Sequence, residues 1–132
     1  MIEEITVETR VRYAECDAQR VAHHSVFPVW MEMARTELLR ANGVSYRECE
    51  DSGVYFVVVR LSISYRRPAV YDDMLSIDVK TTNVGRVKLE HEYVFKRGDE
   101  VLATAATTLA CVDRLGRPMA MPEGFLKGSA RL

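Results

Sequence analysis

Cysteine and long apolar runs are scarce in this chain of 132 residues. The cysteines are odd in number, lie far apart and form no CxxC motif: Cys16, Cys49 and Cys111. A disulfide framework or a zinc site therefore has little support, and we expect reduced thiols that are mostly buried. No apolar run approaches the ~18 residues that a membrane-spanning helix needs, and the acidic start MIEEITVETR does not resemble a secretory signal. We expect a cytoplasmic protein.

An excess of charge of one sign is also absent. The formal net charge is −1, and acidic and basic residues alternate along the chain. This pattern is not typical of a nucleic-acid surface, so we expect small-molecule or protein partners and no nucleic acid. The length and the 48% hydrophobic content fit a single domain over 1–132, without internal repeats or a low-complexity linker.

Alternating apolar and polar residues predict most of the secondary structure. A first strand has one apolar face, formed by Ile5, Val7, Val11 and Tyr13. The same alternation predicts strands over 55–65, 75–80, 87–96 and 101–112, separated by glycine-containing turns. Because the connections between the later strands are short, we expect an antiparallel meander.

Helical spacing replaces this alternation from Ser25 onward. The apolar stripe consists of Phe27, Trp30, Met31, Ala34 and Leu38, and Gly43 ends the run. Ser45 and Glu48 form a capping box that predicts a short helix over about 45–52. One long helix and about five strands, each with one apolar face, bury that surface only if the sheet wraps the helix, so the expected fold class is α+β.

The stretch between the first strand and the long helix carries the candidate active site. Asp17 lies seven positions before His24, just ahead of a helix whose first turn has unpaired backbone N–H groups. A helix N-terminus can polarise a carbonyl oxygen, while a nearby carboxylate attacks the carbonyl carbon or activates a water molecule. This pairing predicts acyl transfer or hydrolysis.

Other roles for these residues remain open from spacing alone. Asp17 could cap the helix, and His24 could act through its side chain or only through its backbone. The histidines, including His23 and His91, do not match a closed zinc pattern, so no metal site is predicted. Glu32 on the helix is a further candidate carboxylate, although charged neighbours on a helix commonly form i, i+3 pairs.

Two segments resemble one family in order, spacing and residue type: VRYAECDAQRVAHHSVFPVWMEMARTELLR and YFVVVRLSISYRRPAVYDDMLSIDV. The chain is similar, from about residue 5 to 122, to the YbgC/4-hydroxybenzoyl-CoA thioesterase family. The resemblance implies the hotdog fold, in which an antiparallel sheet of about five strands wraps a long central helix. It also implies that Asp17 is the catalytic carboxylate, as nucleophile or general base, and that the backbone N–H of His24 binds the thioester carbonyl.

The same resemblance implies a substrate and an assembly. The expected substrate is an acyl-CoA, or an acyl group on acyl carrier protein, with no metal or organic cofactor. Hotdog subunits join their sheets, so we expect a homodimer at minimum and a homotetramer as the common assembly. The residues expected to contact the acyl group or CoA are Phe27, Val58, Val59, Arg60, Gly85 and Arg86.

This chain departs from the family pattern within the candidate site. Gln19-Arg20 stands where relatives usually have a glycine, Val26 replaces a frequent asparagine, and Phe27 replaces a frequent tyrosine. Arg20 adds a cation that favours a negatively charged acyl group or a nucleotide phosphate. Two alternative functions are a non-catalytic acyl-CoA-binding module and a dehydratase or hydratase that pairs His24 with Glu32.

Overall fold

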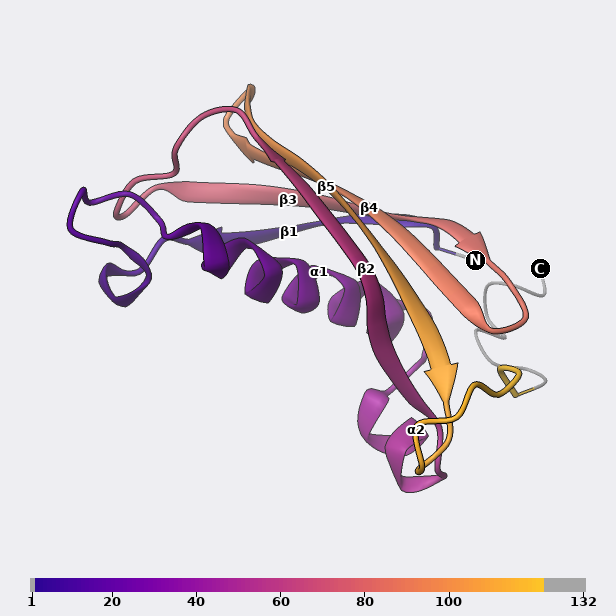
Figure 1. Ribbon diagram of the computed structural model, residues 1–132. Coiled ribbons are helices and arrows are strands. Elements are labelled where there is room, and N and C mark those ends of the chain that lie inside the picture. The colour runs from indigo at the N-terminus through magenta and orange to yellow at the C-terminus, as the bar shows by residue number, and fades with distance from the viewer. Residues whose placement is uncertain (1, 123–132) are drawn as a thin grey trace.

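The protein folds as one five-stranded antiparallel sheet wrapped around one long helix, as a computed structural model of residues 2–122 shows (Figure 1). The elements are β1 (Glu4–Arg10), α1 (Phe27–Ala41), α2 (Tyr46–Asp51), β2 (Tyr55–Tyr65), β3 (Met74–Val84), β4 (Lys88–Arg97) and β5 (Glu100–Val112). Two 3₁₀ helices, η1 (Tyr13–Glu15) and η2 (His24–Val26), lie between β1 and α1. The predicted α+β fold class is confirmed.

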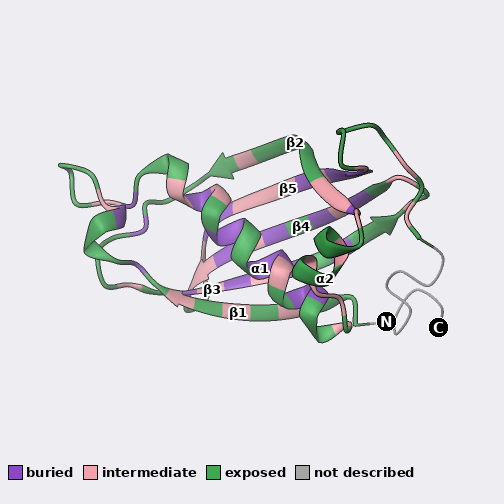
Figure 2. Ribbon diagram, turned by 90° about the horizontal axis from the view of Figure 1, so that it is seen from below, coloured by how far each residue is buried: buried purple, intermediate pink, exposed green. Residues whose placement is uncertain are grey.

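The strand order is β1-β3-β4-β5-β2. Strands β3, β4 and β5 form the predicted meander, but β2 lies beyond β5, where Tyr55 pairs with Val112 and Tyr65 with Ala103. Figure 2 shows α1 crossing the inner face of the sheet: its first turn lies near the end of β2, where Tyr65 packs on Phe27, and its last turn lies near the start of β1, where Asn42 bonds Ile2. The first two strands form the two opposite edges.

Helix α1 buries the apolar stripe that its spacing predicted, with all five predicted residues at most 2% exposed. Pro28 lies in the first turn, where its missing N–H is tolerated. The run stops beside Gly43, whose φ of 79° is a left-handed conformation that glycine adopts without strain. The helix prediction is confirmed, with its first turn formed as the 3₁₀ helix η2.

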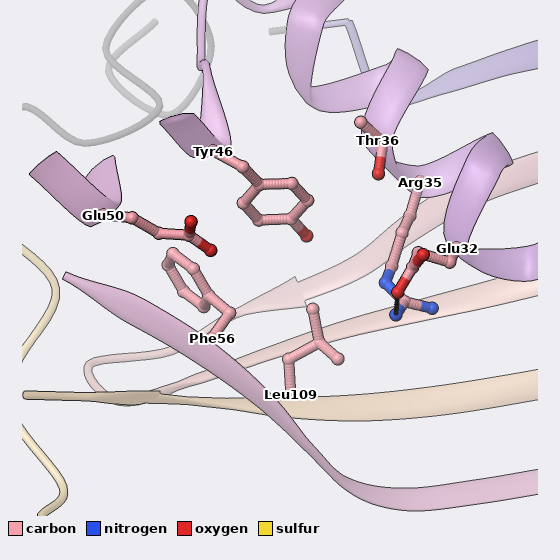
Figure 3. A pocket seen from close by; sticks show the side chains of 7 residues that line it. All are labelled: Glu32, Arg35, Thr36, Tyr46, Glu50, Phe56 and Leu109. Atoms are coloured by element: carbon pink, nitrogen blue, oxygen red, sulfur yellow. Dashed lines mark ion pairs between the residues drawn. The ribbon is translucent and has the colours of Figure 1, made fainter. Parts of the chain in front are cut away.

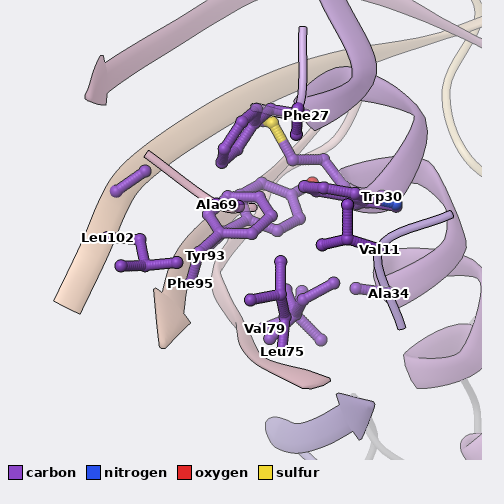
Figure 4. Packing of buried hydrophobic residues seen from close by; sticks show 14 of the residues in the cluster. Val11, Phe27, Trp30, Ala34, Ala69, Leu75, Val79, Tyr93, Phe95 and Leu102 are labelled. Carbon is purple, nitrogen blue, oxygen red and sulfur yellow. The ribbon is translucent and has the colours of Figure 1, made fainter. Parts of the chain in front are cut away.

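Aromatic rings make up the centre of the core (Figure 4). Phe27 packs edge to face on both Trp30 and Phe95, with ring centroids 5.0 Å apart in each pair. Leu75 and Val79 of β3 cover the same cluster and are fully buried. Because these side chains come from α1, β3 and β4, the core holds the helix at a fixed position on the sheet.

Helix α2 begins where the capping box predicted. The Ser45 side-chain oxygen accepts the backbone N–H of Glu48 at 3.3 Å. A second apolar cluster, formed by Leu39, Leu89 and Leu109, lies at this end of the molecule. The short helix is therefore confirmed.

Tyr13 does not lie on the buried face of the first strand, so that part of the strand prediction is wrong. Strand β1 ends at Arg10, and Tyr13 begins η1 with 79% of its surface exposed. The Glu15 N–H donates to the Arg12 carbonyl at 3.0 Å, and the Glu15 carboxylate accepts the Arg12 N–H at 2.8 Å. These local bonds turn the chain just after Val11, whose N–H donates to the Asp73 carbonyl at 2.9 Å.

His91 is a buried histidine on β4, only 1% exposed. Neither ring nitrogen has a hydrogen-bond partner within the described part of the chain. Burial lowers the pKa of His91 to about 4, and the nearby Arg35 guanidinium lowers it further in the same direction. His91 is therefore neutral at pH 7.

We predict that His91 makes the fold sensitive to acid. The unfolded chain protonates this residue near pH 6.5, whereas the folded chain does so only near pH 4. The contribution of neutral His91 to the free energy of unfolding is fully present above pH 6.5. It is lost as the pH falls toward 4, and the total loss is about 3 kcal/mol. Urea unfolding at pH 7.5 and 4.5, at one protein concentration, should show a smaller loss for His91→Gln than for wild type. His23→Gln, at an exposed site, is the control, and equal losses in wild type and His91→Gln would refute this role.

Candidate active site

Asp17 lies in a tight loop that extends beyond the N-terminal end of α1 (Figure 1). Cys16 and Ala22 form an antiparallel bridge at its base, and the Asp17 N–H donates to the Val21 carbonyl at 3.0 Å. One carboxylate oxygen of Asp17 accepts the Gln19 N–H at 2.8 Å. The other oxygen has no partner among residues 2–122, and the side chain is exposed. A carboxylate is therefore held in a defined turn, and one of its oxygens has no partner among the described residues.

Arg20 closes this turn in a left-handed conformation, with φ of 66°. Its N–H donates to the Asp17 carbonyl at 2.9 Å. A non-glycine residue in this region costs on the order of 1 kcal/mol, so the chain maintains a strained residue beside the carboxylate. The replacement of the usual glycine noted in the sequence therefore keeps the loop closed and adds a cation.

The Asp17 loop is anchored to two other segments. Val21 forms a bridge with Val70, and the Ala22 N–H donates to the Ala69 carbonyl at 2.8 Å. The His23 N–H donates to the Glu15 carbonyl at 2.9 Å. These bonds join the loop to the connection between β2 and β3 and to η1.

Glu15 joins the loop to the helix. Its carboxylate is 8% exposed and accepts the indole N–H of Trp30 at 3.3 Å and the Arg12 guanidinium at 3.1 Å. Because Trp30 lies in the core, this contact fixes the distance between the Asp17 loop and the start of α1. Glu15 was not identified from the sequence, although it lies two positions before Asp17.

The backbone N–H of His24 is free at the start of η2. The neighbouring donors are occupied: the Ser25 N–H by the His23 ring at 3.2 Å, and the Val26 N–H by the His23 carbonyl at 3.0 Å. For the His24 N–H, no acceptor lies within residues 2–122. Helix α1 follows directly, so this donor carries the partial positive charge of a helix N-terminus. The position suits a developing oxyanion.

Tyr65, at the end of β2, also fixes the His24 peptide. Its hydroxyl donates to the His24 carbonyl at 2.9 Å. Burial raises the pKa of this hydroxyl, so it remains a donor at neutral pH. Tyr65 also packs edge to face on Phe27 at 5.1 Å. The sequence analysis did not identify Tyr65 as a site residue, because its hydrogen bond to His24 joins residues 41 positions apart.

The two predicted catalytic residues line different hollows of a single subunit. Asp17 lines a hollow of about 430 Å³ together with Arg20 and an edge-to-face pair of rings, Tyr13 and Tyr71. His24 lines one of about 280 Å³, whose other walls are Ala22, Phe27, Tyr65, Arg66, Arg67, Pro68 and Ala69. The structure therefore joins Asp17 and His24 through one hydrogen-bonded segment rather than in one enclosed pocket.

The remaining predicted contacts lie elsewhere on the subunit. Val58, Val59 and Arg60 are exposed on the free edge formed by β2. Gly85 and Arg86 form the turn after β3, an eleven-residue strand that starts near the Asp17 loop and runs away from it for roughly 35 Å (Figure 1). Within one subunit, neither group lies beside Asp17.

Metal-ligating residues do not gather at this site. Among the described residues, no cluster of three or more His, Cys, Asp or Glu side chains could hold a metal ion. The His23 and His24 rings stack with centroids 4.2 Å apart, and His23 accepts from Ser25. Within the same residues, no helix has the length and apolar character needed to cross a membrane.

Comparison with known proteins identifies similar chains. A family model described as the thioesterase superfamily matches residues 19–104. The acyl-CoA thioester hydrolase YbgC of Escherichia coli O6:H1 is 33% identical over 119 residues, which are 89% of each chain. The acyl-CoA thioesterase YbgC of Haemophilus influenzae is 34% identical over 86% of this chain and 85% of its own.

Solved structures give the same result. The hypothetical protein TT1821 from Thermus thermophilus superposes with a TM-score of 0.89 and 31% identity, covering 96% of this chain and 98% of its own. The resemblance found in the sequence is therefore confirmed.

Proposed function

The chain belongs to the thioesterase superfamily, and on this premise we propose that it hydrolyses the thioester bond of an acyl-CoA. Asp17 acts as nucleophile, forming a mixed anhydride, or as general base for a water molecule. In this proposal the Asp17 carboxylate and the His24 N–H perform the reaction without a metal or organic cofactor. Coenzyme A is part of the substrate. The observation that supports this proposal most directly is the free N–H of His24 on the same anchored segment as the Asp17 carboxylate.

The His24 N–H accounts for stabilisation of the transition state. When the thioester carbon becomes tetrahedral, its oxygen gains negative charge, and a preorganised backbone donor at a helix N-terminus stabilises that charge by about 3 kcal/mol. The donor needs no reorganisation because Tyr65 and the His23 cap hold the turn. The role of His24 is therefore assigned to its backbone.

A homodimer completes this site in our proposal. Strand β2 is an edge strand of eleven residues whose apolar side chains are exposed, including Val57, Val58, Val59 and Leu61. An exposed apolar edge is normally covered, and antiparallel pairing with a second copy of β2 satisfies its backbone groups. This pairing brings the partner's Val58, Val59 and Arg60 close to the acyl-CoA bound at Asp17.

A tetramer provides the contact for the nucleotide. The outer face of β5 presents small side chains, including Thr104, Ala106 and Thr108, and is suited to packing against another sheet. We propose that Gly85 and Arg86 of a second subunit bind the phosphates of coenzyme A. Acyl carrier protein remains an alternative donor of the acyl group.

The alternative function as a dehydratase or hydratase has less support than the thioesterase function. It requires the His24 imidazole and a helix carboxylate to face one substrate. Such a pair would have to meet across the dimer, and the Glu32 carboxylate already lies 3.9 Å from the Arg35 guanidinium. A non-catalytic acyl-CoA-binding module is the alternative that the first experiment distinguishes.

We predict that Asp17→Asn reduces thiol release from acyl-CoAs at least about 100-fold, because the amide keeps the shape but is neither nucleophile nor base. A panel of aliphatic and aromatic acyl-CoAs should be assayed with a thiol reagent. Asp72→Asn is the matched control, since Asp72 is an exposed aspartate with φ of 72°, which asparagine also adopts. If wild type binds acyl-CoAs but releases no thiol, the thioesterase proposal is wrong and the protein is a non-catalytic acyl-CoA-binding module.

We predict opposite results for two substitutions at His24. His24→Pro removes the N–H at the first position of η2, where proline fits the helix and the preceding His23 is already extended, with φ of −64° and ψ of 142°. The rate should fall 10²–10³-fold, as expected for loss of an oxyanion donor. His24→Ala keeps the N–H and should retain activity within about tenfold of wild type. A larger loss in His24→Ala than in His24→Pro would assign the chemistry to the imidazole.

We predict that Val59→Lys weakens the dimer. The substitution places two like charges in an apolar edge contact, one from each copy of β2, where they repel each other. Sedimentation should show wild type at twice the 15.0 kDa of one chain or more and the variant shifted toward one chain. Val84→Lys, on β3, is the control. A dimer unaffected by Val59→Lys would mean that β2 is not the contact.

A further inference from the structure

A third hollow lies away from the Asp17 loop, between the middle of α1, helix α2 and the start of β2 (Figure 3). Its volume is about 280 Å³. The lining combines polar groups with an apolar wall: Glu32, Arg35 and Thr36 from α1, Tyr46 and Glu50 from α2, and Phe56 from β2. Leu109 closes the side toward the sheet.

Arg35 is the unusual member of this hollow. It is 6% exposed, yet its recorded ion pair is a long one of 3.9 Å, to Glu32, whose side chain is 68% exposed. The Nε atom has no hydrogen-bond partner within the described residues. A buried guanidinium is costly unless a closely paired anion occupies its donors. The structure thus presents a buried cation with an open donor position at the wall of a cavity.

The groups around Arg35 do not supply the missing charge. His91 is neutral, with a pKa of about 4, and offers no negative charge. Burial raises the pKa of the Tyr46 and Tyr93 hydroxyls, an effect that the charge of Arg35 and its side-chain hydrogen bond to each hydroxyl oxygen oppose, so both hydroxyls remain neutral. A carboxylate is the group that matches a planar guanidinium together with a phenolic hydroxyl.

We propose that this hollow binds the free carboxylate of an acyl group, so that Arg35 gives the enzyme a preference for acyl-CoAs whose chain ends in a carboxylate. Phe56 and Leu109 supply the apolar wall for the methylene groups. The inference rests on the proposed thioesterase function and adds the chemical class of its acyl group.

The course of β2 explains how the hollow reaches the thioester. Tyr65, at one end of the strand, bonds the His24 carbonyl, and Phe56, at the other end, lines the hollow. Antiparallel pairing of two β2 strands places the Tyr65 end of one copy beside the Phe56 end of the other. The acyl chain held at His24 of one subunit therefore extends toward the partner's Arg35.

Two carboxylates at the hollow would repel a bound anion. Glu32 and Glu50 are both exposed, so solvent and salt screen their repulsion, whereas Arg35 is buried and is screened much less. Glu32 also competes for the guanidinium. Its removal should strengthen the preference that removal of Arg35 abolishes.

The test compares matched substrates that differ only at the chain end, such as octanoyl-CoA with suberoyl-CoA and hexanoyl-CoA with adipoyl-CoA. Arg35→Met should lower kcat/KM for the carboxylated member about 30-fold or more and change the unsubstituted member less than about threefold. Arg35→Lys should be intermediate, and Glu32→Gln should raise the preference severalfold. Arg40→Met is the matched control, because Arg40 forms an i, i+3 pair with Glu37 on the exposed side of the same helix.

A binding measurement separates this inference from the proposed function. Free suberate should raise the melting temperature of wild type and Arg40→Met but not that of Arg35→Met, whether or not any thioester is cleaved. The proposal is overturned if Arg35→Met lowers both substrates of a pair equally, or if it alters only the dimer, which would assign Arg35 to the subunit contact. It is also overturned if the preference persists in Arg35→Lys and Arg35→Met but disappears in Arg66→Met. If Arg35→Met does not fold, Arg35→Lys and Glu32→Gln must still shift the preference in opposite directions.

Discussion

Burial of the apolar stripe of α1 against the curved sheet is the contact on which the other features depend. The stripe is wider than one strand can cover, so β3, β4 and β5 all contribute side chains to it, with Phe95 and Leu75 packing near Trp30. The helix cannot shift along the sheet without opening this core. Its N-terminus is therefore fixed in space, and the Trp30 indole then positions Glu15 and the loop that carries Asp17.

Local patterns in the sequence were sufficient to predict most of the helices and strands. Period-two alternation identified the strands, and the spacing from Phe27 to Leu38 identified the helix, because these patterns reflect which side of each element is buried. The seven-residue spacing also placed Asp17 and His24 on one continuous segment, which backbone hydrogen bonds anchor to η1 and to the connection between β2 and β3. Tyr13 was misassigned because a hydrogen-bonded turn at Arg12 and Glu15 interrupts the alternation.

Features that depend on distant contacts were not predictable in this way. The position of β2 beyond β5 depends on its long-range pairing with β5, which no local pattern encodes. The same holds for the bond from Tyr65 to His24 and for the burial of Arg35, both of which arise from tertiary packing. Gly85 and Arg86 follow the end of β3, so their predicted contact with coenzyme A would require a second subunit.

The hydrogen bond from Tyr65 to the His24 carbonyl has a consequence for regulation. Tyr65 belongs to the edge strand, and His24 belongs to the turn that receives the carbonyl oxygen in the proposed mechanism, so one hydrogen bond couples the edge strand to that turn. In the proposed dimer, ordering of the edge and ordering of the turn are thermodynamically linked. Linkage is reciprocal: if association of the subunits tightens substrate binding by some factor, bound substrate tightens association of the subunits by the same factor. The concentration of the protein itself then becomes a variable that sets its affinity for substrate.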